Sequence, residues 1–332
     1  MRLCLDARKL NAKTIRDAYP LANTMRILSN LGRNKYFSVI DLKESFLQVN
    51  LSEDSRKYTS FKIIGRGLFQ YKRLPFGLIN SSATMSRILD KVLKEGMYEP
   101  FIFAYLDDII VATTTFDEHI KYLNILADCL KQANLSINLG KCRFCVKRIK
   151  YLGFILSEDG YQPNPERVAA ISKFVRPKTP KEIRRFLGMA GYYRNFIPKF
   201  SGISAPLSDL LKGNPKKIKW NEKAEQAFIK LKECLMSEPV LANPDWSKEF
   251  TIQTDASDLA IAGILTQEIK GKEHIIAYFS RKLTACERKY CPTDKEGLAA
   301  LESIEHYRSY VEGNHFTLVT NCSAITFICN SK

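Results

Sequence analysis

Two adjacent carboxylates are the strongest chemical signal in this 332-residue chain. Asp107 and Asp108 stand between the apolar runs FIFAYL and IIVAT. Holding two like charges about 4 Å apart costs on the order of 4 kcal/mol at an effective dielectric constant of 20, so a positive group is expected beside them. Magnesium is a hard cation that takes oxygen ligands, often one or two carboxylates together with substrate phosphates. Asp41, which also ends an apolar run, is the expected third ligand.

The local pattern leaves plainer interpretations of these aspartates open. Aspartate is common in ordinary hairpin turns, which would explain Asp107 and Asp108. A lone aspartate such as Asp41 often caps a helix. Because Asp41 and Asp107 are 66 residues apart in the sequence, their spacing alone does not show that they meet in space.

The segments that must position these residues alternate between strand-like and helix-like patterns. Gly65-Arg66-Gly67 marks a hairpin turn between two β-rich runs, whereas apolar residues at helical spacing predict helices. We expect strands within 35–51, 59–77, 101–113 and 135–156, and helices over 81–93 and 117–134. This mixed order favours an α+β domain over a parallel α/β sheet.

The second half of the chain has a more helical pattern. We expect helices over 165–174, 180–190 and 222–236, with prolines at 177, 180, 198, 206 and 215 between them. A boundary near residues 238–248 precedes a new strand that starts at Phe250.

The basic charge of the chain is concentrated in its first part. The formal charge is +16, but residues 1–240 hold 41 Lys and Arg against 23 Asp and Glu, whereas residues 241–332 hold 10 against 12. Residues 141–220 alone hold 18 basic and 5 acidic residues, interleaved with tyrosines. Such a segment suits the backbone of a polyanion, so nucleic acid is the expected partner. A generally solvated basic surface is the alternative, but it does not explain an excess confined to a quarter of the chain.

The overall composition is that of a soluble globular protein, with 45% hydrophobic and 26% charged residues. No run approaches the ~20 apolar residues of a membrane span, so no membrane partner is expected. The first residues lack the apolar core of a signal peptide. Nine cysteines without a repeated spacing indicate reduced thiols. We therefore expect an intracellular, cytoplasmic protein.

Seven ordered segments resemble the successive motifs of gypsy-type retrotransposon reverse transcriptases. A YxDD tetrapeptide alone would be weak support, but the ordered set is specific and is distributed over residues 3–201. The segments are LCLDARKLN (3–11), YFSVIDLKESFLQV (36–49), RLPFGLINSSATM (73–85), YLDDIIV (105–111), LGKCRF (139–144), YLGFILSEDG (151–160) and IRRFLGMAGYYRNFIPKFS (183–201). The resemblance implies a right-hand polymerase with partial fingers, a palm and a helical thumb.

The resemblance also implies an RNA-directed DNA polymerase, which adds dNTPs to a primer 3′-hydroxyl on an RNA or DNA template. Asp41, Asp107 and Asp108 would bind two Mg²⁺ or Mn²⁺ ions, one activating the attacking oxygen and the other holding the triphosphate. Lys141 matches a lysine proposed to protonate the leaving pyrophosphate. The alternative for Lys141 is a contact to nucleic acid as a point charge.

Four further residues match the nucleotide pocket of the family. Arg2 matches a triphosphate-contacting arginine, and its planar guanidinium suits phosphate oxygens. Phe46 matches the aromatic ring beneath the sugar that excludes a 2′-hydroxyl, while Phe76 and Gly77 match the turn against the incoming nucleotide. The alternatives are a solvated terminal charge for Arg2 and a core aromatic for Phe46.

The segment that follows the palm matches the parts of the family that hold the template–primer duplex. Residues 151–157 resemble the primer grip, which begins with Tyr151, Leu152 and Gly153, and residues 164–220 resemble the thumb. Contacts to the nucleic-acid backbone position a duplex without reading its sequence. The candidates for these contacts are Arg184, Arg185, Arg194 and Lys199. A solvated helix face is the alternative for all four.

From Phe250 onward the chain resembles the ribonuclease H domain of the same elements. Asp255 and Glu296 match the first two metal-binding carboxylates of that family. Asn321 stands where the family has a third carboxylate, and the sequence ends at Lys332 before a fourth. Because an amide is a neutral ligand, we expect weak binding of two dications and impaired ribonuclease H activity.

Three segments are therefore expected in this chain. Partial fingers and palm occupy 1–160, thumb and linker 161–240, and a C-terminally truncated ribonuclease H-like α/β domain 241–332. The family's upstream fingers, protease and integrase are not in the sequence, which suggests a polyprotein fragment. The intact palm aspartates favour an active polymerase, whereas the missing fingers and Asn321 favour an inactive nucleic-acid-binding remnant. The sequence leaves the oligomeric state unknown.

Overall fold

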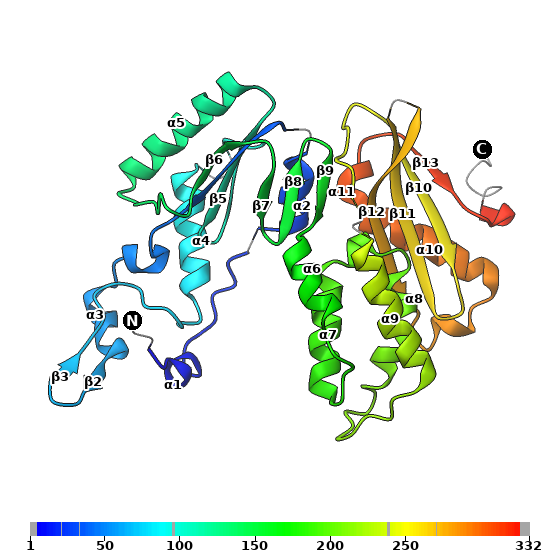
Figure 1. Ribbon diagram of the computed structural model, residues 1–332, viewed down its shortest axis with the longest axis horizontal. Helices are drawn as coiled ribbons and strands as arrows, with labels where there is room; N and C mark the ends of the chain where they lie inside the picture. Colours follow the sequence, from blue (N-terminus) through cyan, green and yellow to red (C-terminus); the bar gives the residue numbers. More distant parts are fainter. Residues whose placement is uncertain are drawn as a thin grey trace. The chain divides into compact units, whose positions relative to one another are not determined.

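Contacts between residues divide the chain into two units (Figure 1). The computed structural model describes residues 5–20, 22–32, 34–94, 97–237, 240–269 and 271–325. The first unit ends at Leu152 and the second begins at Gly153. The thumb-like helices and the ribonuclease H-like segment therefore belong to one unit. The boundaries expected at residues 160 and 240 stay predictions.

A four-stranded antiparallel sheet in the order β4-β5-β1-β6 forms the centre of the first unit. Its strands are β1 (Tyr36–Asp41), β4 (Ile102–Tyr105), β5 (Asp108–Thr113) and β6 (Arg143–Val146). The strands expected around the aspartates are confirmed. The antiparallel pairing of β4 with β5 makes the segment 101–113 a hairpin, with Asp107 in its turn.

The other elements of the first unit surround this sheet. The helices are α1 (Arg8–Asn11), α2 (Thr24–Asn30), η1 (Ser45–Gln48), α3 (Glu53–Arg56), η2 (Lys57–Thr59), α4 (Ser81–Val92) and α5 (Phe116–Gln132). The strands are β2 (Phe61–Ile63), β3 (Gly67–Phe69) and β7 (Ile149–Tyr151). The hairpin expected at Gly65 is confirmed, with φ values of +77° at Gly65 and +99° at Gly67.

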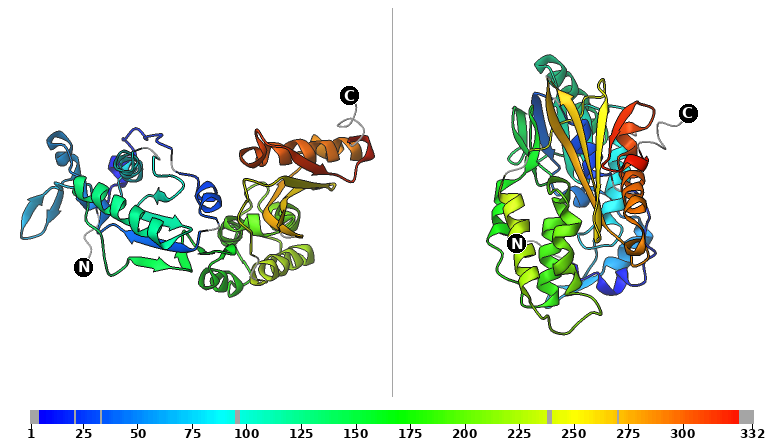
Figure 2. Two further views of the ribbon diagram at one scale, coloured as in Figure 1. Left: turned by 90° about the horizontal axis from the view of Figure 1, so that it is seen from above. Right: turned by 90° about the vertical axis from the view of Figure 1, so that its right-hand side faces the viewer.

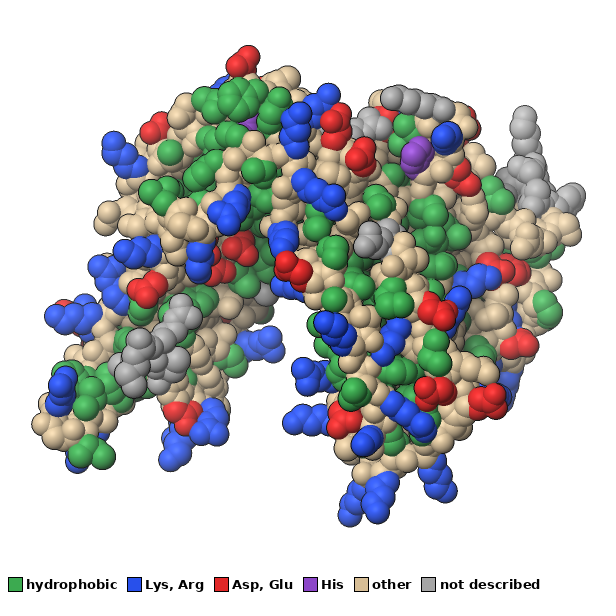
Figure 3. Space-filling view, in the orientation of Figure 1, with side chains coloured by type: hydrophobic (Ala, Val, Ile, Leu, Met, Phe, Trp, Pro, Cys, Tyr) green, Lys and Arg blue, Asp and Glu red, His purple; other side chains and the backbone are tan. Residues whose placement is uncertain are grey.

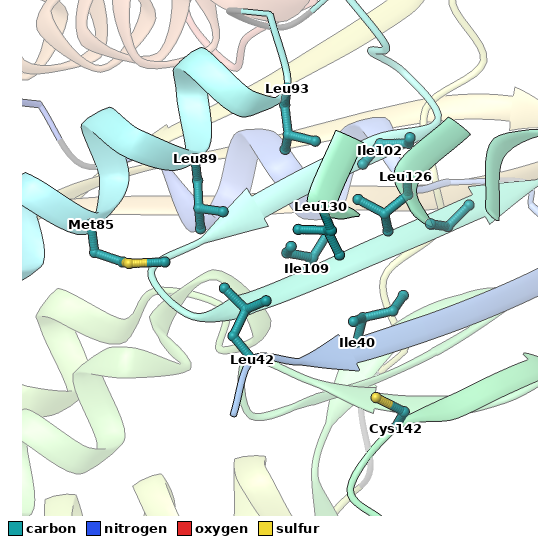
Figure 4. Close-up of a cluster of buried hydrophobic side chains, with 11 residues drawn as sticks. Ile40, Leu42, Met85, Leu89, Leu93, Ile102, Ile109, Leu126, Leu130 and Cys142 are labelled. Carbon is teal, nitrogen blue, oxygen red and sulfur yellow. The ribbon is translucent and has the colours of Figure 1, made fainter. Parts of the chain in front are cut away.

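Helices α4 and α5 cover one face of the sheet through a buried apolar cluster (Figure 4). The cluster consists of Ile40, Leu42, Met85, Leu89, Leu93, Ile102, Ile109, Val111, Leu126, Leu130 and Cys142. Ile40 and Ile109 are register partners on β1 and β5, and both belong to this cluster. Successive side chains of a strand point to opposite faces, so Asp41 and Asp108 lie on the face away from α4 and α5.

The second unit contains a four-stranded sheet in the order β12-β11-β10-β13, in which β13 runs parallel to β10 and the other pairs are antiparallel. Its strands are β10 (Phe250–Ala256), β11 (Ala260–Ile269), β12 (Lys272–Lys282) and β13 (Phe316–Val319). Helix α10 (Pro292–His306) packs on β10 and β11. A Cβ at Gly263 would lie 2.3 Å from Ser303 Oγ, so only glycine allows α10 to approach this closely.

Four longer helices complete the second unit, and α8 and α10 lie on opposite faces of its sheet (Figure 2). They are α6 (Pro165–Ser172), α7 (Pro180–Tyr192), α8 (Phe200–Asp209) and α9 (Glu222–Met236). The shorter elements are β8 (Phe154–Ser157), β9 (Gly160–Pro163), η3 (Arg194–Phe196), η4 (Glu287–Lys289) and α11 (Arg308–Val311). Within the described residues, no helix is both long enough and apolar enough to cross a membrane.

Three of the four helices were expected from the sequence, and each begins at a polar cap. The side chains of Asn164, Thr179 and Asn221 accept backbone N–H groups at the starts of α6, α7 and α9. Helix α8 was not expected, because Pro206 was interpreted as part of a break between helices. That interpretation is wrong: Pro206 lies inside α8, although its ring removes one backbone hydrogen bond.

Candidate functional site

The three predicted palm aspartates lie at the same ends of β1 and β5. The register pairs Asp41 directly with Asp108, and Asp107 occupies the two-residue turn between β4 and β5. Leu106, the other residue of this turn, has φ +58°, a left-handed conformation that is uncommon outside glycine. The N–H of Leu42 lies 3.4 Å from the carbonyl oxygen of Asp107, which places the turn next to the end of β1.

Negative charge is concentrated at these strand ends. Burial raises the pKa of Asp108, and the charges of Asp107 and Asp41 raise it further. Lys141 opposes this shift, and its Nζ lies 3.6 Å from Asp41 Oδ2. One ammonium therefore faces three carboxylates, an arrangement whose remaining negative charge favours a further cation.

A cation would need ligands beyond the protein at this site. Among the residues that the structure describes, no three His, Cys, Asp or Glu side chains are grouped so that they could hold a metal ion by themselves. Carboxylate oxygens nevertheless have the right chemistry for Mg²⁺, which commonly takes one or two carboxylates together with substrate phosphates. The cross-strand pair of Asp41 and Asp108 fits a metal site in which substrate phosphates supply the remaining ligands. The binding of two ions stays a prediction.

Hydrogen bonds place Lys141 beside Asp41. The N–H of Asn138 donates to the carbonyl oxygen of Asp41 at 2.8 Å, which holds the segment before Lys141 against β1. The Gln48 side chain fixes the same segment, because its amide donates to the Ser136 carbonyl at 3.0 Å and its oxygen accepts from the Ser136 N–H at 2.6 Å. No motif in the sequence pointed to Gln48, whose signal there is a polar side chain within the apolar run FLQV.

The expected nucleotide-pocket residues come together from different elements. Phe46 in η1 meets Phe76 edge to face, with ring centroids 5.3 Å apart. Gly77 has φ +97°, and the side chain of Asn11 holds this turn by donating to the Gly77 carbonyl at 2.8 Å. Asn11 received no role from the sequence, although it ends the first matched segment. Arg2 lies outside the described residues.

Phe46 also contacts the core of the first unit. It is partly buried and packs against the cluster beneath α4 and α5. Both interpretations of this residue, a core aromatic and a gate beside the sugar, are consistent with that position.

The residues expected to form a primer grip begin directly beneath the aspartates. The buried Tyr151 hydroxyl donates to the carbonyl oxygen of Asp108 at 3.4 Å, and burial, followed by the charge of Asp108, raises the pKa of Tyr151. Leu152 and Gly153 have φ values of +45° and +83°, so they form a tight turn. The φ of Gly153 would strain any other residue there, and a Cβ would also displace the Arg167 guanidinium, whose nearest nitrogen would lie 2.5 Å away.

Exposed basic side chains gather over the lower part of the helical segment in Figure 3. Arg184 and Arg185 are both exposed on α7, where Arg184 donates to Asn214 Oδ1 at 2.7 Å. Arg194 is exposed beside a cavity of about 190 Å³. Lys199 differs from these three, because its Nζ lies 2.7 Å from Asp255 Oδ2. Its expected contact with a nucleic-acid backbone would have to replace this ion pair.

The two ribonuclease H-like carboxylates lie on neighbouring elements of the second unit. Asp255 is near the end of β10, and Glu296 on α10 accepts the Ala256 N–H at 3.3 Å through Oε1. Glu296 Oε2 is buried, and the described residues provide it with no hydrogen-bond partner. Burial raises the pKa of Glu296 and Asp255 raises it further, whereas the Ala256 N–H and the charge of Lys199 lower it.

Asn321 follows the end of β13, two residues after Val319. The parallel register pairs Gln253 with Val319, so Asp255 and Asn321 each lie two residues beyond that pair. An amide stands where the resemblance implied a third carboxylate, and one of the two carboxylates before it, Asp255, is ion-paired with Lys199. These residues do not fit a three-carboxylate metal site.

Comparisons with known families match both units. Residues 1–156 match the family described as "Reverse transcriptase (RNA-dependent DNA polymerase)". Residues 220–318 match the family described as "RNase H-like domain found in reverse transcriptase". Both matches agree with the order of domains that was expected from the sequence.

Curated relatives match over essentially the whole chain. The Retrovirus-related Pol polyprotein from transposon 297 of Drosophila melanogaster is 38% identical over 331 residues, covering 100% of this chain and 31% of the relative. The corresponding polyprotein from transposon gypsy of the same organism is 38% identical, covering 98% and 32%. The Transposon Tf2-3 polyprotein of Schizosaccharomyces pombe is 33% identical, covering 94% and 23%. The chain thus spans about a third or less of the length of these relatives.

Solved structures share the fold. The foamy viral protease-reverse transcriptase in complex with dsDNA aligns with a TM-score of 0.84 at 27% identity, covering 100% of this chain and 68% of that protein. The same enzyme in complex with an RNA/DNA hybrid aligns with a TM-score of 0.79 at 28% identity, covering 96% and 43%. The expected α+β fold, with a right-hand polymerase part followed by a ribonuclease H-like domain, is confirmed.

Proposed function

Since this chain belongs to the reverse transcriptases of gypsy-type retrotransposon Pol polyproteins, we propose that it is an RNA-directed DNA polymerase. It would extend a primer 3′-hydroxyl with dNTPs on an RNA or DNA template. The cross-strand pair of Asp41 and Asp108, with Asp107 in the adjoining turn, is the observation that carries this proposal. The nucleic acids bound by the similar foamy viral enzyme, dsDNA and an RNA/DNA hybrid, support the choice of template.

The aspartates would act as ligands for Mg²⁺ or Mn²⁺. Such ions, when bound, supply positive charge that stabilises a phosphoryl-transfer transition state and makes an attacking hydroxyl more acidic. Asp41 and Asp108 present their carboxylates from adjacent strands, and Tyr151 anchors the backbone of Asp108 from below. Lys141, held near Asp41, would donate a proton from Nζ to the leaving pyrophosphate.

The test of this proposal is primer extension on an RNA template. The expected result is addition of complementary deoxynucleotides that requires a divalent cation. The competing proposal is a nucleic-acid-binding remnant without activity, which Asn321 favours because the resemblance implies a carboxylate at that position. A chain that binds the duplex but adds no nucleotide in Mg²⁺ or Mn²⁺ would establish the remnant instead.

Phe46→Ala should admit ribonucleotides. We propose that the Phe46 ring, held edge to face by Phe76, blocks the 2′-hydroxyl of an incoming nucleotide. Removing the ring opens that space, so the preference for deoxynucleotides over ribonucleotides should fall by on the order of 10²-fold. The ratio of kcat/KM for dCTP and CTP measures this preference.

Phe46→Tyr is the matched control for this experiment, because it retains the ring. It should keep the preference of the parent chain. If Phe46→Ala leaves the preference unchanged while lowering the melting temperature, Phe46 acts only as a core side chain. That outcome would show that the Phe46 ring does not exclude ribonucleotides. The assignment of the aspartates as metal ligands would be unaffected.

The duplex would lie along exposed basic side chains of the second unit. Arg184, Arg185 and Arg194 are exposed, and each carries a guanidinium suited to phosphate oxygens. Lys199 is the weaker candidate, since Asp255 already pairs with it. We propose that these contacts hold the duplex without reading its sequence.

The ribonuclease H-like domain is proposed to be impaired. Two dications carry +4, whereas two carboxylates and a scissile phosphate supply only about −3, so the second ion would be held loosely. We expect the chain to cleave the RNA strand of a labelled RNA–DNA hybrid no faster than its Asp255→Asn variant does. Robust cleavage that disappears in Asp255→Asn would show that Asn321 is tolerated.

A further inference from the structure

The ammonium of Lys199 lies beside one of the two carboxylates expected to bind metal in the ribonuclease H-like domain. Lys199 lies between η3 and α8, and its Nζ reaches Asp255 Oδ2 at 2.7 Å. Its backbone is left-handed, with φ +52°. A lysine rarely adopts this conformation without support from the surrounding structure, so the position of Lys199 depends on how α8 is held.

Hydrogen bonds hold the start of α8 on the sheet. The N–H of Ser201 donates to Ser280 Oγ at 2.9 Å, and the Ser201 hydroxyl donates to the Ser280 carbonyl at 2.9 Å. Further along the helix, Lys282 of β12 donates to the Ala205 carbonyl at 3.2 Å. These contacts fix the backbone beside Lys199, so less entropy is lost when its side chain extends to Asp255.

The second carboxylate, that of Glu296, lies next to the one that Lys199 contacts. Glu296 Oε2 is buried without a hydrogen-bond partner among the described residues, and such an oxygen requires nearby positive charge or a proton. Glu296 Oε1 accepts the N–H of Ala256, the residue after Asp255, so the ammonium on Asp255 stands beside this second carboxylate. One lysine thus lies beside a pair of carboxylates, and Asn321, where a third was expected, is neutral.

We propose that Lys199 takes the place of a divalent cation beside Asp255 and Glu296. The ammonium already supplies the positive charge that these carboxylates need, and a dication entering the cluster would have to displace it and replace its hydrogen bond to Asp255. The domain would thereby keep its fold without a resident metal. The start of α8 would be joined to strands β10 and β12 through contacts of Lys199, Ser201 and Lys282. The ribonuclease H-like domain would thus support that helix.

A competing account is that a metal ion displaces the lysine easily. The side chains of Lys199 and Asp255 are 64% and 40% exposed, and exposed ion pairs contribute little to stability. The two accounts differ in where a divalent cation binds on the unaltered chain. Iron bound at a protein site directs hydroxyl-radical cleavage of the nearby backbone, so Fe²⁺ with ascorbate and peroxide can locate it.

The experiment compares iron-directed cleavage of the full chain with that of Lys199→Gln and Lys199→Arg. The unaltered chain and Lys199→Arg should show no cuts near Asp255 or Glu296, because both retain a cation. Lys199→Gln should gain cuts there by about tenfold or more, as expected when a unit charge a few ångströms from a metal ion is removed. Adding Asp255→Asn to Lys199→Gln should abolish the new cuts.

Two outcomes would overturn the proposal. Cuts near Asp255 in the unaltered chain, as strong as those in Lys199→Gln, would show that a metal displaces the lysine freely. Absence of cuts in a folded Lys199→Gln chain would show that something other than Lys199 keeps metal away. Circular dichroism of each variant establishes that it is folded. Neither outcome depends on polymerase activity, so the proposal can fail while the polymerase assignment stands.

Discussion

The Asp108→Asn variant is expected to lose primer extension while still binding the duplex. Asparagine keeps the size of the side chain but removes one of three negative charges at the strand ends. Losing several kcal/mol of transition-state stabilisation lowers the rate of nucleotide incorporation by about 10³-fold or more. Single-turnover incorporation of one nucleotide, measured at saturating enzyme, separates this rate from binding.

The loss should not arise from unfolding. Burial and the charges of Asp107 and Asp41 raise the pKa of Asp108, so its ionised form is less favourable in the folded chain than in the unfolded chain. The stability that this carboxyl contributes is therefore present at low pH and lost as the pH rises through its folded-state pKa. Without metal, Asp108→Asn should melt higher than the parent at pH 7, and the difference should vanish below about pH 4.

Asp128→Asn is a suitable control for the same chemical change. Asp128 is exposed on α5, which covers the face of the sheet opposite Asp41 and Asp108. This variant should retain full activity. Undiminished incorporation by Asp108→Asn would remove the assignment of a metal-dependent site to these aspartates.

Reversing both Arg184 and Arg185 to glutamate should flatten the salt dependence of duplex binding. Each phosphate neutralised by a protein cation contributes about 0.9 to the slope of log affinity against log salt concentration. If both arginines contact phosphates, the slope should fall by about 1.8. Fluorescence anisotropy of a labelled duplex from low to high salt provides both slopes.

A charge-matched control separates contact from net charge. Lys121→Glu with Lys131→Glu makes the same change of charge on exposed positions of α5, away from the face that carries Asp41. That control should weaken binding less and should keep the slope of the parent chain. An unchanged slope in the Arg184 and Arg185 variant would place the duplex on another surface.

Local sequence patterns were sufficient to predict most of the secondary structure. Apolar runs and helical spacing identified the strands of the first sheet and helices α4 and α5, because burial on one face imposes a regular period on the sequence. Helix α8 was missed for a local reason. Proline usually breaks a helix, but Pro206 lies in a helix that packing against α9 and β12 stabilises.

Long-range contacts were much less accessible from the sequence. The register that pairs Asp41 with Asp108 could be expected only through the family resemblance, since nothing in either segment encodes its partner. The hydrogen bonds of Asn11 to the Gly77 turn were missed for the same reason. Lys199 was grouped with the duplex-binding residues because of its basic neighbourhood, whereas the structure pairs it with Asp255 from a distant segment.

The most direct test of the polymerase assignment uses the chain itself with an RNA template. A labelled DNA primer annealed to RNA is incubated with the chain, four dNTPs and Mg²⁺, and the products are separated by length. The account predicts stepwise extension toward the template end, which stops when the complementary dNTP is omitted. A folded chain that binds this duplex but adds not even one nucleotide, with Mg²⁺ or Mn²⁺, would contradict it.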